Sequence, residues 1–500
     1  MDDAPMRSSM RKYWAEHSKA ATIEEMMLDS HAQIIAVEEQ PEIIDMLPDI
    51  DGKTILELGA GIGRFTDHFA TVGNNVTAVD FMKTFLDRNR EQNNHHANIS
   101  YIQSDVMQLE LQKNSFDLIF SNWLFMYLSD AEIVRLTQRM LEWLKPGGFL
   151  FFRESCFYQS GDSKRFFNPT VYRKPAAYNL LLTSVVQETA GLENKSYGFE
   201  IVMSKCVQTY IKVKRNQNQV CWLLQKLPRN PSANQGYGTF QQFLDNHQYS
   251  RRGILRYEKI FGQGFVSTGG QETTKEFLAL LNLQPGQKVL DVGCGIGGGD
   301  IYMAKAYGVE VLGIDLSSNM VEIAMERTVD EDVPLVQYEI GDATKRVFPE
   351  HSFDVIYSRD TILHISDKFA LFQKFYSWLK PGGKLLISDY CCGEKQWSNG
   401  YKEYVKERGY ILYSTEEYGE FLQKARFVNV RAMDRTAQFV DILKKELQKT
   451  ESIKDEFIQE FSEEDYLYIV NGWKRKLQHC ELGDQRWGLF YAEKPKNEQG

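Results

Sequence analysis

The sequence predicts an α/β fold made of two tandem, doubly wound domains, each with a helical lid. Five short motifs occur twice in the same order, beginning with ILELGAGIGRF around Ile55 and VLDVGCGIGGG around Val289. Corresponding glycines, acids and lysines of the two copies are 234 or 235 positions apart. Apolar strand-like runs alternate with amphipathic segments, and 500 residues exceed the size of a single hydrophobic core. Two copies of one domain explain all three observations.

The motifs place strands and turns in the same order in each copy. The first is an apolar strand that ends at a glycine turn and leads into a helix. VTAVDF and VLGIDL are second strands, QSDV and IGDA end third strands, and FDLIFSN and FDVIYSR are buried fourth strands. LKPGG is a turn before a fifth strand. This alternation predicts a parallel sheet covered by helices, with ligands outside the carboxyl ends of the strands.

The domain boundaries follow from composition. Residues 1–227 form the predicted N-terminal domain, which begins with apolar residues at helical spacing in YWAEHS and TIEEMMLDSHAQIIAVEE. Residues 228–239, rich in Pro, Gly, Asn and Ser, form the predicted linker. Residues 240–500 form the C-terminal domain, whose first 31 residues are a lid-like helical segment.

The overall composition excludes several classes of protein. A formal net charge of -10 disfavours nonspecific nucleic-acid binding. The seven cysteines show neither a disulfide framework nor zinc-site spacing, so we expect a reducing compartment and no metal. No signal peptide or membrane-length apolar run is evident, which predicts a cytoplasmic protein without stable membrane association. The oligomeric state stays open.

The glycine turns and the acids after the second strands indicate a nucleotide-type ligand. Glycines such as Gly59 and Gly293 let a strand turn tightly while the backbone approaches a ligand. Asp80 and Asp315, 21 and 22 residues farther on, can accept hydrogen bonds from ribose hydroxyls. These features alone also fit a dinucleotide, and Gly and Asp often end strands without binding anything.

Further acids give the pattern a family resemblance. Glu57 and Asp291 precede the first glycine by two residues, Asp105 and Asp342 end the third strands, and LKPGG follows. The combination resembles Rossmann-like class I S-adenosylmethionine-dependent methyltransferases, in which these acids face the methionine and adenine amino groups respectively. The resemblance implies one S-adenosylmethionine per domain. The cofactor residues it implies are Glu57, Gly59, Gly61, Arg64, Asp80, Asp105, Val106 and Asn122 in the first copy, and Val266, Ser267, Asp291, Gly293, Gly295, Asp315, Leu316, Asp342, Ala343 and Arg359 in the second.

Other segments resemble the phosphoethanolamine methyltransferases, and the tandem arrangement resembles their two-domain members. YSRDTILHIS, SDYC, EYVKERGY and GWKRKL carry this resemblance in the second copy; MMLDS, FRESCFYQSGDSKR and NQNQVCWLLQK carry it in the first. It implies a catalytic dyad of Tyr249 and His364. The implied acceptor residues of the second copy are Gln248, Tyr257, Asp360, Tyr390, Tyr404, Arg408, Tyr410 and Lys476.

The chemistry of these residues agrees with that family. Arg408 and Lys476 can hold a dianionic phosphate, and tyrosine rings can surround a methylated ammonium, with Asp360 as countercharge. The attacking amine must lose a proton, and histidine is well suited to accept one. Without the resemblance, a packed His364 and a core Tyr249 would be the preferred interpretation.

The first copy departs from this pattern. Aligning SNWLFMYLS with SRDTILHIS places Asn122, Trp123 and Tyr127 where the second copy has Arg359, Asp360 and His364. Candidate phosphate contacts are Ser155, Ser160, Gly161, Thr170, Tyr172 and Arg173, while Tyr13 and His17 could approach the acceptor from the lid. Each of these could equally be an ordinary loop residue.

The resemblance implies three successive N-methylations of phosphoethanolamine to phosphocholine, the first in the N-terminal domain and the later two in the C-terminal domain. An alternative makes the N-terminal copy a regulatory cofactor-binding module. A sterol or fatty-acyl acceptor is less favoured, because no long apolar segment is present to receive it.

Overall fold

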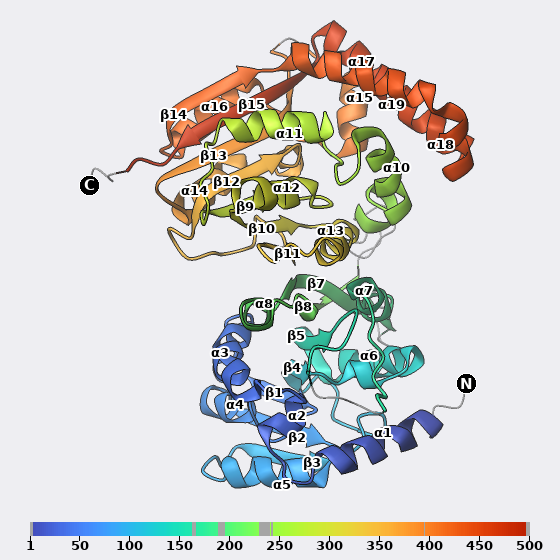
Figure 1. Ribbon diagram of the computed structural model, residues 1–500, viewed down its shortest axis with the longest axis vertical. Coiled ribbons are helices and arrows are strands. Elements are labelled where there is room, and N and C mark those ends of the chain that lie inside the picture. Colours follow the sequence, from blue (N-terminus) through green and yellow to red (C-terminus); the bar gives the residue numbers. More distant parts are fainter. Residues whose placement is uncertain are drawn as a thin grey trace. The chain divides into compact units, whose positions relative to one another are not determined.

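A computed structural model describes residues 4–162, 167–188, 196–229, 241, 244–394 and 396–496; the side chains of residues 4–8, 247 and 248 are not described. The chain divides into two compact units, Met1–Phe243 and Leu244–Gly500 (Figure 1). Most of the predicted linker, residues 230–239, lies outside the described residues. The linker and its bounds therefore stay a prediction.

The first unit is a sheet in the order β7-β8-β5-β4-β1-β2-β3, with β6 on β7. Its strands are β1 (Thr54–Leu58), β2 (Asn75–Asp80), β3 (Ile99–Gln103), β4 (Phe116–Asn122), β5 (Leu144–Ser155), β6 (Gln187–Glu188), β7 (Ser196–Cys206) and β8 (Gln219–Pro228). Its helices are α1 (Ala4–His17), α2 (Ile23–Met27), α3 (Ala32–Ile44), α4 (Thr66–Val72), α5 (Lys83–Gln92), the 3-10 turn η1 (Phe125–Tyr127), α6 (Asp130–Trp143), α7 (Pro175–Thr183) and α8 (Gln208–Lys214).

The second unit repeats this plan in the order β14-β15-β13-β12-β9-β10-β11. Its strands are β9 (Lys288–Val292), β10 (Glu310–Asp315), β11 (Val336–Ile340), β12 (Phe353–Arg359), β13 (Leu379–Cys392), β14 (Val428–Asp434) and β15 (Gln485–Glu493). Its helices are the π-helical turn η3 (Leu244–Gln248), α10 (Arg251–Phe261), α11 (Gly270–Ala279), α12 (Gly298–Tyr307), α13 (Ser318–Asp330), η4 (Ile362–His364), α14 (Lys368–Trp378), α15 (Asn399–Arg408), α16 (Thr415–Lys424), α17 (Thr436–Ser452), α18 (Lys454–Glu460) and α19 (Glu463–Leu482).

Each sheet is held by helices that bury apolar side chains against it. In the second unit α14 contributes Phe372 and Phe375, and α16 contributes Tyr418 and Leu422, to a core shared with β12 and β13. In the first unit Phe69 of α4 belongs to the equivalent cluster. Burying each such side chain stabilises the fold by about 1.5–3 kcal/mol before entropy is counted.

The predicted α/β architecture is confirmed in both copies, with two refinements. The β3-β2-β1-β4-β5 and β11-β10-β9-β12-β13 neighbours pair in parallel, as expected, but β8 and β15 pair antiparallel with β5 and β13. The LKPGG segment is a bend at the start of the fifth strand, where Gly147 has a φ of +81° and the register shifts. Among the described residues, no helix has the length and apolarity needed to cross a bilayer.

Candidate active site

The glycine turns have the same geometry in both units. Gly61 has a φ of +54° and donates its N–H to Asp80 at 2.9 Å; Gly295 has a φ of +55° and donates to Asp315 at 3.1 Å. The left-handed conformation is one that glycine adopts without steric cost. Each turn thus lies against the acid at the end of the second strand, at the carboxyl edge of the sheet.

Both turns are lined by acids that are costly to ionise. Burial raises the pKa of Glu57 to about 8 and that of Asp80 to about 6. Burial likewise raises the pKa of Asp291 to about 7 and that of Asp315 to about 6. Glu57 accepts a 2.5 Å hydrogen bond from Thr66. A cationic ligand would stabilise the ionised acids, so both turns suit a positively charged group.

The other predicted cofactor residues of the first copy are spread around this turn. Asn122 and Arg64 line its pocket, although Arg64 also forms an ion pair with buried Glu39. Asp105 lies beyond β3, 3.6 Å from Arg11, and is not among the pocket-lining residues. Val106 follows it and is buried.

In the second copy the equivalent residues are arranged similarly. Asp342 accepts hydrogen bonds from Thr344, and buried Ala343 follows it. Leu316, directly after Asp315, is half-buried. Val266 lies beside Gly295: a Cβ atom added to this glycine would be 3.0 Å from Cγ2 of Val266. Ser267 follows Val266.

Arg359 has partners in the protein. It donates to the Thr268 carbonyl at 2.6 Å, to Thr274 at 2.7 Å and to Thr273 at 2.9 Å. The guanidinium therefore orders the segment that follows Ser267. Its predicted contact with the cofactor stays a prediction.

A pocket in the first unit joins the glycine turn to a polar end. Ser155, Ser160, Gly161 and Tyr172, all predicted, line it together with the glycine turn. Trp123 and Tyr127, which align with Asp360 and His364, also line it, and the lining further includes Trp14, Asp29 and Tyr210, which were not predicted. The MMLDS motif contains Asp29 and was a signal that could have led to it.

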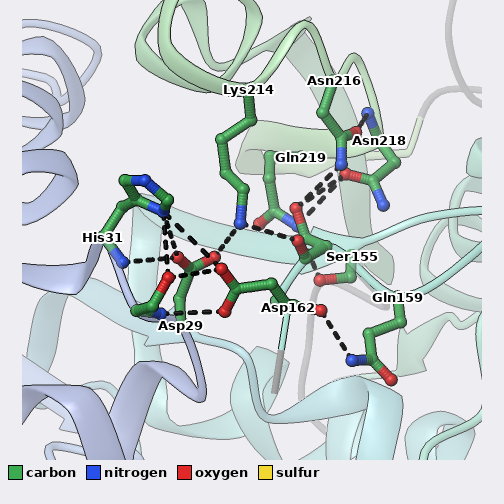
Figure 2. A network of polar contacts seen from close by, with 12 residues as sticks. Asp29, His31, Ser155, Gln159, Asp162, Lys214, Asn216, Asn218 and Gln219 are labelled. Atoms are coloured by element: carbon green, nitrogen blue, oxygen red, sulfur yellow. Dashed lines mark hydrogen bonds and ion pairs between the residues drawn. The ribbon is translucent and has the colours of Figure 1, made fainter. Parts of the chain in front are cut away.

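The polar end of this pocket is held together by a polar network (Figure 2). Lys214 donates to Asp29 and, at 3.2 Å, to the Ser160 carbonyl. The Ser160 hydroxyl lies between Asn216 and Asn218, at 3.2 and 3.0 Å. The pocket wall is therefore fixed by contacts between the N-terminal segment, the loop after β5 and the α8–β8 turn.

Other candidates of the first copy lie outside the pocket lining. Tyr13 and His17 stack on each other with ring centroids 4.2 Å apart. Thr170 has a buried hydroxyl but does not line the pocket. Arg173 donates to Asp130 at 2.8 Å and to the carbonyls of Phe125 and Leu128, so it holds the turn that carries Tyr127.

In the second unit Tyr249 and His364 meet, as the resemblance implies. The tyrosine hydroxyl lies 3.4 Å from Nε2 of His364. Burial lowers the pKa of His364 to about 4, with smaller contributions from Lys368 and Arg408. Burial raises the pKa of Tyr249. At neutral pH both groups are uncharged, so the imidazole can accept a proton, and its lowered pKa makes it a weaker base than an ordinary histidine.

Two cations and a group of tyrosines lie on the same side of the second unit. Lys476 donates to the hydroxyl of Tyr390 at 3.2 Å, and burial lowers its pKa to about 8. The Arg408 guanidinium lies 5.8 Å from the ring of Tyr404, and the ring of Tyr410 is 6.0 Å from that of Tyr404. Neighbouring buried cations favour an anion such as phosphate.

Asp360 lies close enough to Tyr390 and Lys476 for its charge to act on both. It accepts from Trp487 Nε1 at 2.9 Å and from the Thr268 amide at 3.2 Å. Glu446, which the sequence analysis did not single out, accepts from Trp473 at 2.8 Å and attracts Lys476. Tyr257 stacks near Trp473 with centroids 6.1 Å apart. The side chain of Gln248 lies outside the described residues.

Comparison with known proteins places the chain in a family. The methyltransferase-domain family model matches residues 55–148 and 289–383. The chain is 53% identical over 496 residues to phosphoethanolamine N-methyltransferase 1 of Zea mays, covering 98% of this chain and 97% of the relative. It is 52% identical over 490 residues to enzyme 1 of Arabidopsis thaliana, covering 98% of each.

A solved structure agrees with these relatives. Phosphoethanolamine N-methyltransferase 2 of Haemonchus contortus, in complex with phosphomonomethylethanolamine and S-adenosylhomocysteine, matches with a TM-score of 0.74 and 29% identity, covering 92% of this chain and 99% of that one. The duplicated domain, the full-length similarity and the shared tandem fold together lead to one conclusion. The chain belongs to the phosphoethanolamine N-methyltransferase family.

Proposed function

We propose that the chain converts phosphoethanolamine to phosphocholine by three N-methylations with S-adenosylmethionine, one cofactor per domain. The N-terminal domain carries out the first transfer and the C-terminal domain the later two. This division is supported by one observation: the glycine turns have the same geometry in both units, but the aligned residues beyond the fourth strand differ. They are Trp123 and Tyr127 in the first unit and Asp360 and His364 in the second.

The residues at each glycine turn fit this cofactor. A methionyl ammonium and a sulfonium would favour ionisation of the buried acids Glu57 and Asp291, and ribose hydroxyls can donate to Asp80 and Asp315. When bound, S-adenosylmethionine supplies an electrophilic methyl group.

In the C-terminal pocket the protein's own residues prepare the amine. Arg408 and Lys476 hold the phosphate, and Tyr390, Tyr404 and Tyr410 exclude water around the chain. Neutral His364 accepts the amine proton, directly or through the Tyr249 hydroxyl. Asp360 stabilises the positive charge that develops on nitrogen.

A panel of the three phosphobases with labelled methyl donor, run on the full chain, tests the division. Asp80→Ala should abolish methylation of phosphoethanolamine and keep the later two transfers, whereas Asp315→Ala should do the reverse. If Asp80→Ala leaves all three rates unchanged, only the C-terminal domain is catalytic. Full activity of Asp315→Ala on all three substrates would also contradict the division.

A further inference from the structure

Trp123 and Asp360 occupy the same unusual backbone position. Their φ angles are +56° and +48°, and each donates its N–H to the fifth strand, to Arg153 O at 2.8 Å and Ser388 O at 2.7 Å respectively. Left-handed conformations in non-glycine residues cost about 1–3 kcal/mol and cluster at functional sites. Both copies keep this conformation, which fixes where the side chain starts.

The two copies make the same cross-strand hydrogen bond with its donor and acceptor exchanged. In the first unit Trp123 Nε1 donates to Oε1 of Gln219 at 2.8 Å. In the second, Trp487 Nε1 donates to Asp360 at 2.9 Å. Strand register makes Gln219 and Trp487 equivalent, because they pair with Ser155 and Tyr390 at the ends of β5 and β13.

The exchange changes the charge that each position presents. Gln219 and Trp487 are both fully buried, whereas Trp123 and Asp360 are only half-buried and Trp123 lines its pocket. Figure 2 shows Gln219 also reaching Ser155, with its Nε2 2.6 Å from the serine hydroxyl. One copy therefore places an indole where the other places a carboxylate.

The residue behind this position differs as well. Arg153 of β5 pairs with Asn122, and Ser388 of β13 pairs with Arg359. Arg153 and Ser388 are therefore equivalent positions. The Arg153 guanidinium lies 3.9 Å from the centroid of the Trp123 ring and forms a 2.9 Å ion pair with Glu39. The guanidinium thus already occupies one face of the indole, and that face is closed to a second cation.

We infer that the exchanged pair Trp123–Gln219 and Asp360–Trp487, with Arg153 in place of Ser388, decides which domain can perform the third methylation. This inference rests on the proposed function. Each transfer forms an N–C bond as an S–C bond breaks, so positive charge develops on nitrogen. The first two products can lose an N–H proton, but the third product is a quaternary ammonium that cannot.

Asp360 stabilises that permanent charge, whereas the indole with Arg153 behind it does not. The N-terminal pocket is therefore restricted to amines whose product can shed its charge, and it disfavours the dimethyl substrate most strongly.

A graft of the three residues tests this in the full chain. In an Asp315→Ala background, which silences the C-terminal pocket, the substitutions Trp123→Asp, Arg153→Ser and Gln219→Trp are combined. The ratio of kcat/KM for the dimethyl over the unmethylated substrate should rise by at least about tenfold. In the matched control, Trp123→Asp alone, Arg153 neutralises the new carboxylate and the ratio should change by less than about threefold.

A graft that still methylates phosphoethanolamine with an unchanged ratio would overturn the inference. If the graft no longer binds the cofactor in equilibrium dialysis, a second variant tests the inference: Asp360→Asn in an Asp80→Ala background. The asparagine removes the charge but can still accept the hydrogen bond from Trp487. It should reduce kcat/KM for the dimethyl substrate at least about tenfold more than for the monomethyl substrate; equal losses would overturn the inference. If the Asp315→Ala parent methylates no phosphobase at all, it is the proposed function that fails.

Discussion

Replacing His364 by alanine should slow the later methylations without weakening cofactor binding. The imidazole lies 3.4 Å from the Tyr249 hydroxyl, whereas the glycine turn at Gly295 is contacted by Asp315. Loss of a positioned general base typically costs 10²–10⁴ in rate, about 3–5 kcal/mol of transition-state stabilisation. Tyr249→Phe keeps the base and should cost about tenfold, a single hydrogen bond's worth.

The assay measures kcat and KM on the monomethyl substrate, with the dissociation constant of S-adenosylhomocysteine measured by calorimetry. Asp315→Ala is the matched control, because its carboxylate accepts the Gly295 and Ser317 amides and its loss should mainly weaken the cofactor. The assignment would be refuted if His364→Ala weakened cofactor binding as much as Asp315→Ala does, or if it kept the wild-type kcat.

The pH profile provides a second check on His364. Since burial lowers the pKa of this imidazole to about 4, it stays neutral in the free enzyme well below the ordinary value of 6.5. The kcat/KM of the C-terminal reaction should therefore not fall near pH 6.5 through protonation of His364. The wild type and His364→Ala should have the same pH dependence in this range. The N-terminal reaction, which has the same titrating substrate phosphate but Tyr127 at this position, serves as the reference. A limb near 6.5 found only in the C-terminal reaction would contradict the buried, neutral imidazole.

Three further outcomes are expected. Because the pKa values of Glu57 and Asp291 are raised to about 8 and 7, binding of a cationic ligand should release protons, and its affinity should rise with pH through this range and then level off. Calorimetry in buffers of different ionisation enthalpy measures the proton release. An affinity that does not change with pH, without proton release, would count against it. Arg408→Met and Lys476→Met should each raise KM for the phosphobases at least about tenfold, with cofactor affinity unchanged, since a charge-assisted hydrogen bond contributes about 1.5–3 kcal/mol; an unchanged KM would mean that the phosphate binds elsewhere. Glu39→Gln should lower the free energy of unfolding by about 3–5 kcal/mol, because it leaves two buried guanidinium groups without their countercharge; thermal denaturation measures this, and a wild-type Tm would show that the pair is dispensable.

Much of the fold and of the cofactor turns could be predicted because the signals are local. A strand, a glycine turn and an acid about 20 residues farther on are close in sequence, and the parallel topology brings them together without further information. The duplication made each signal visible twice. The predicted linker, cytoplasmic location and residue roles remain predictions.

The acceptor sites were less accessible to sequence analysis. Tyr13, His17 and Thr170 lie close in sequence to pocket residues but outside the lining, because a helix face or a loop path decides where each side chain points. Asp29 and Lys214 are 185 positions apart and meet only through tertiary packing.

By itself, the sequence determined the duplication, the α/β class, the family and the acids at the cofactor turns. Only the tertiary structure showed which residues contact Trp123 and Asp360 from behind. Trp123 and Gln219 are 96 positions apart, and Asp360 and Trp487 are 127 apart. Each pair is brought together by two strand pairings: the parallel fourth and fifth strands, and the antiparallel β8 or β15 beside the fifth. Register depends on how distant segments align across a sheet, and no local pattern encodes which side of such a hydrogen bond carries the charge.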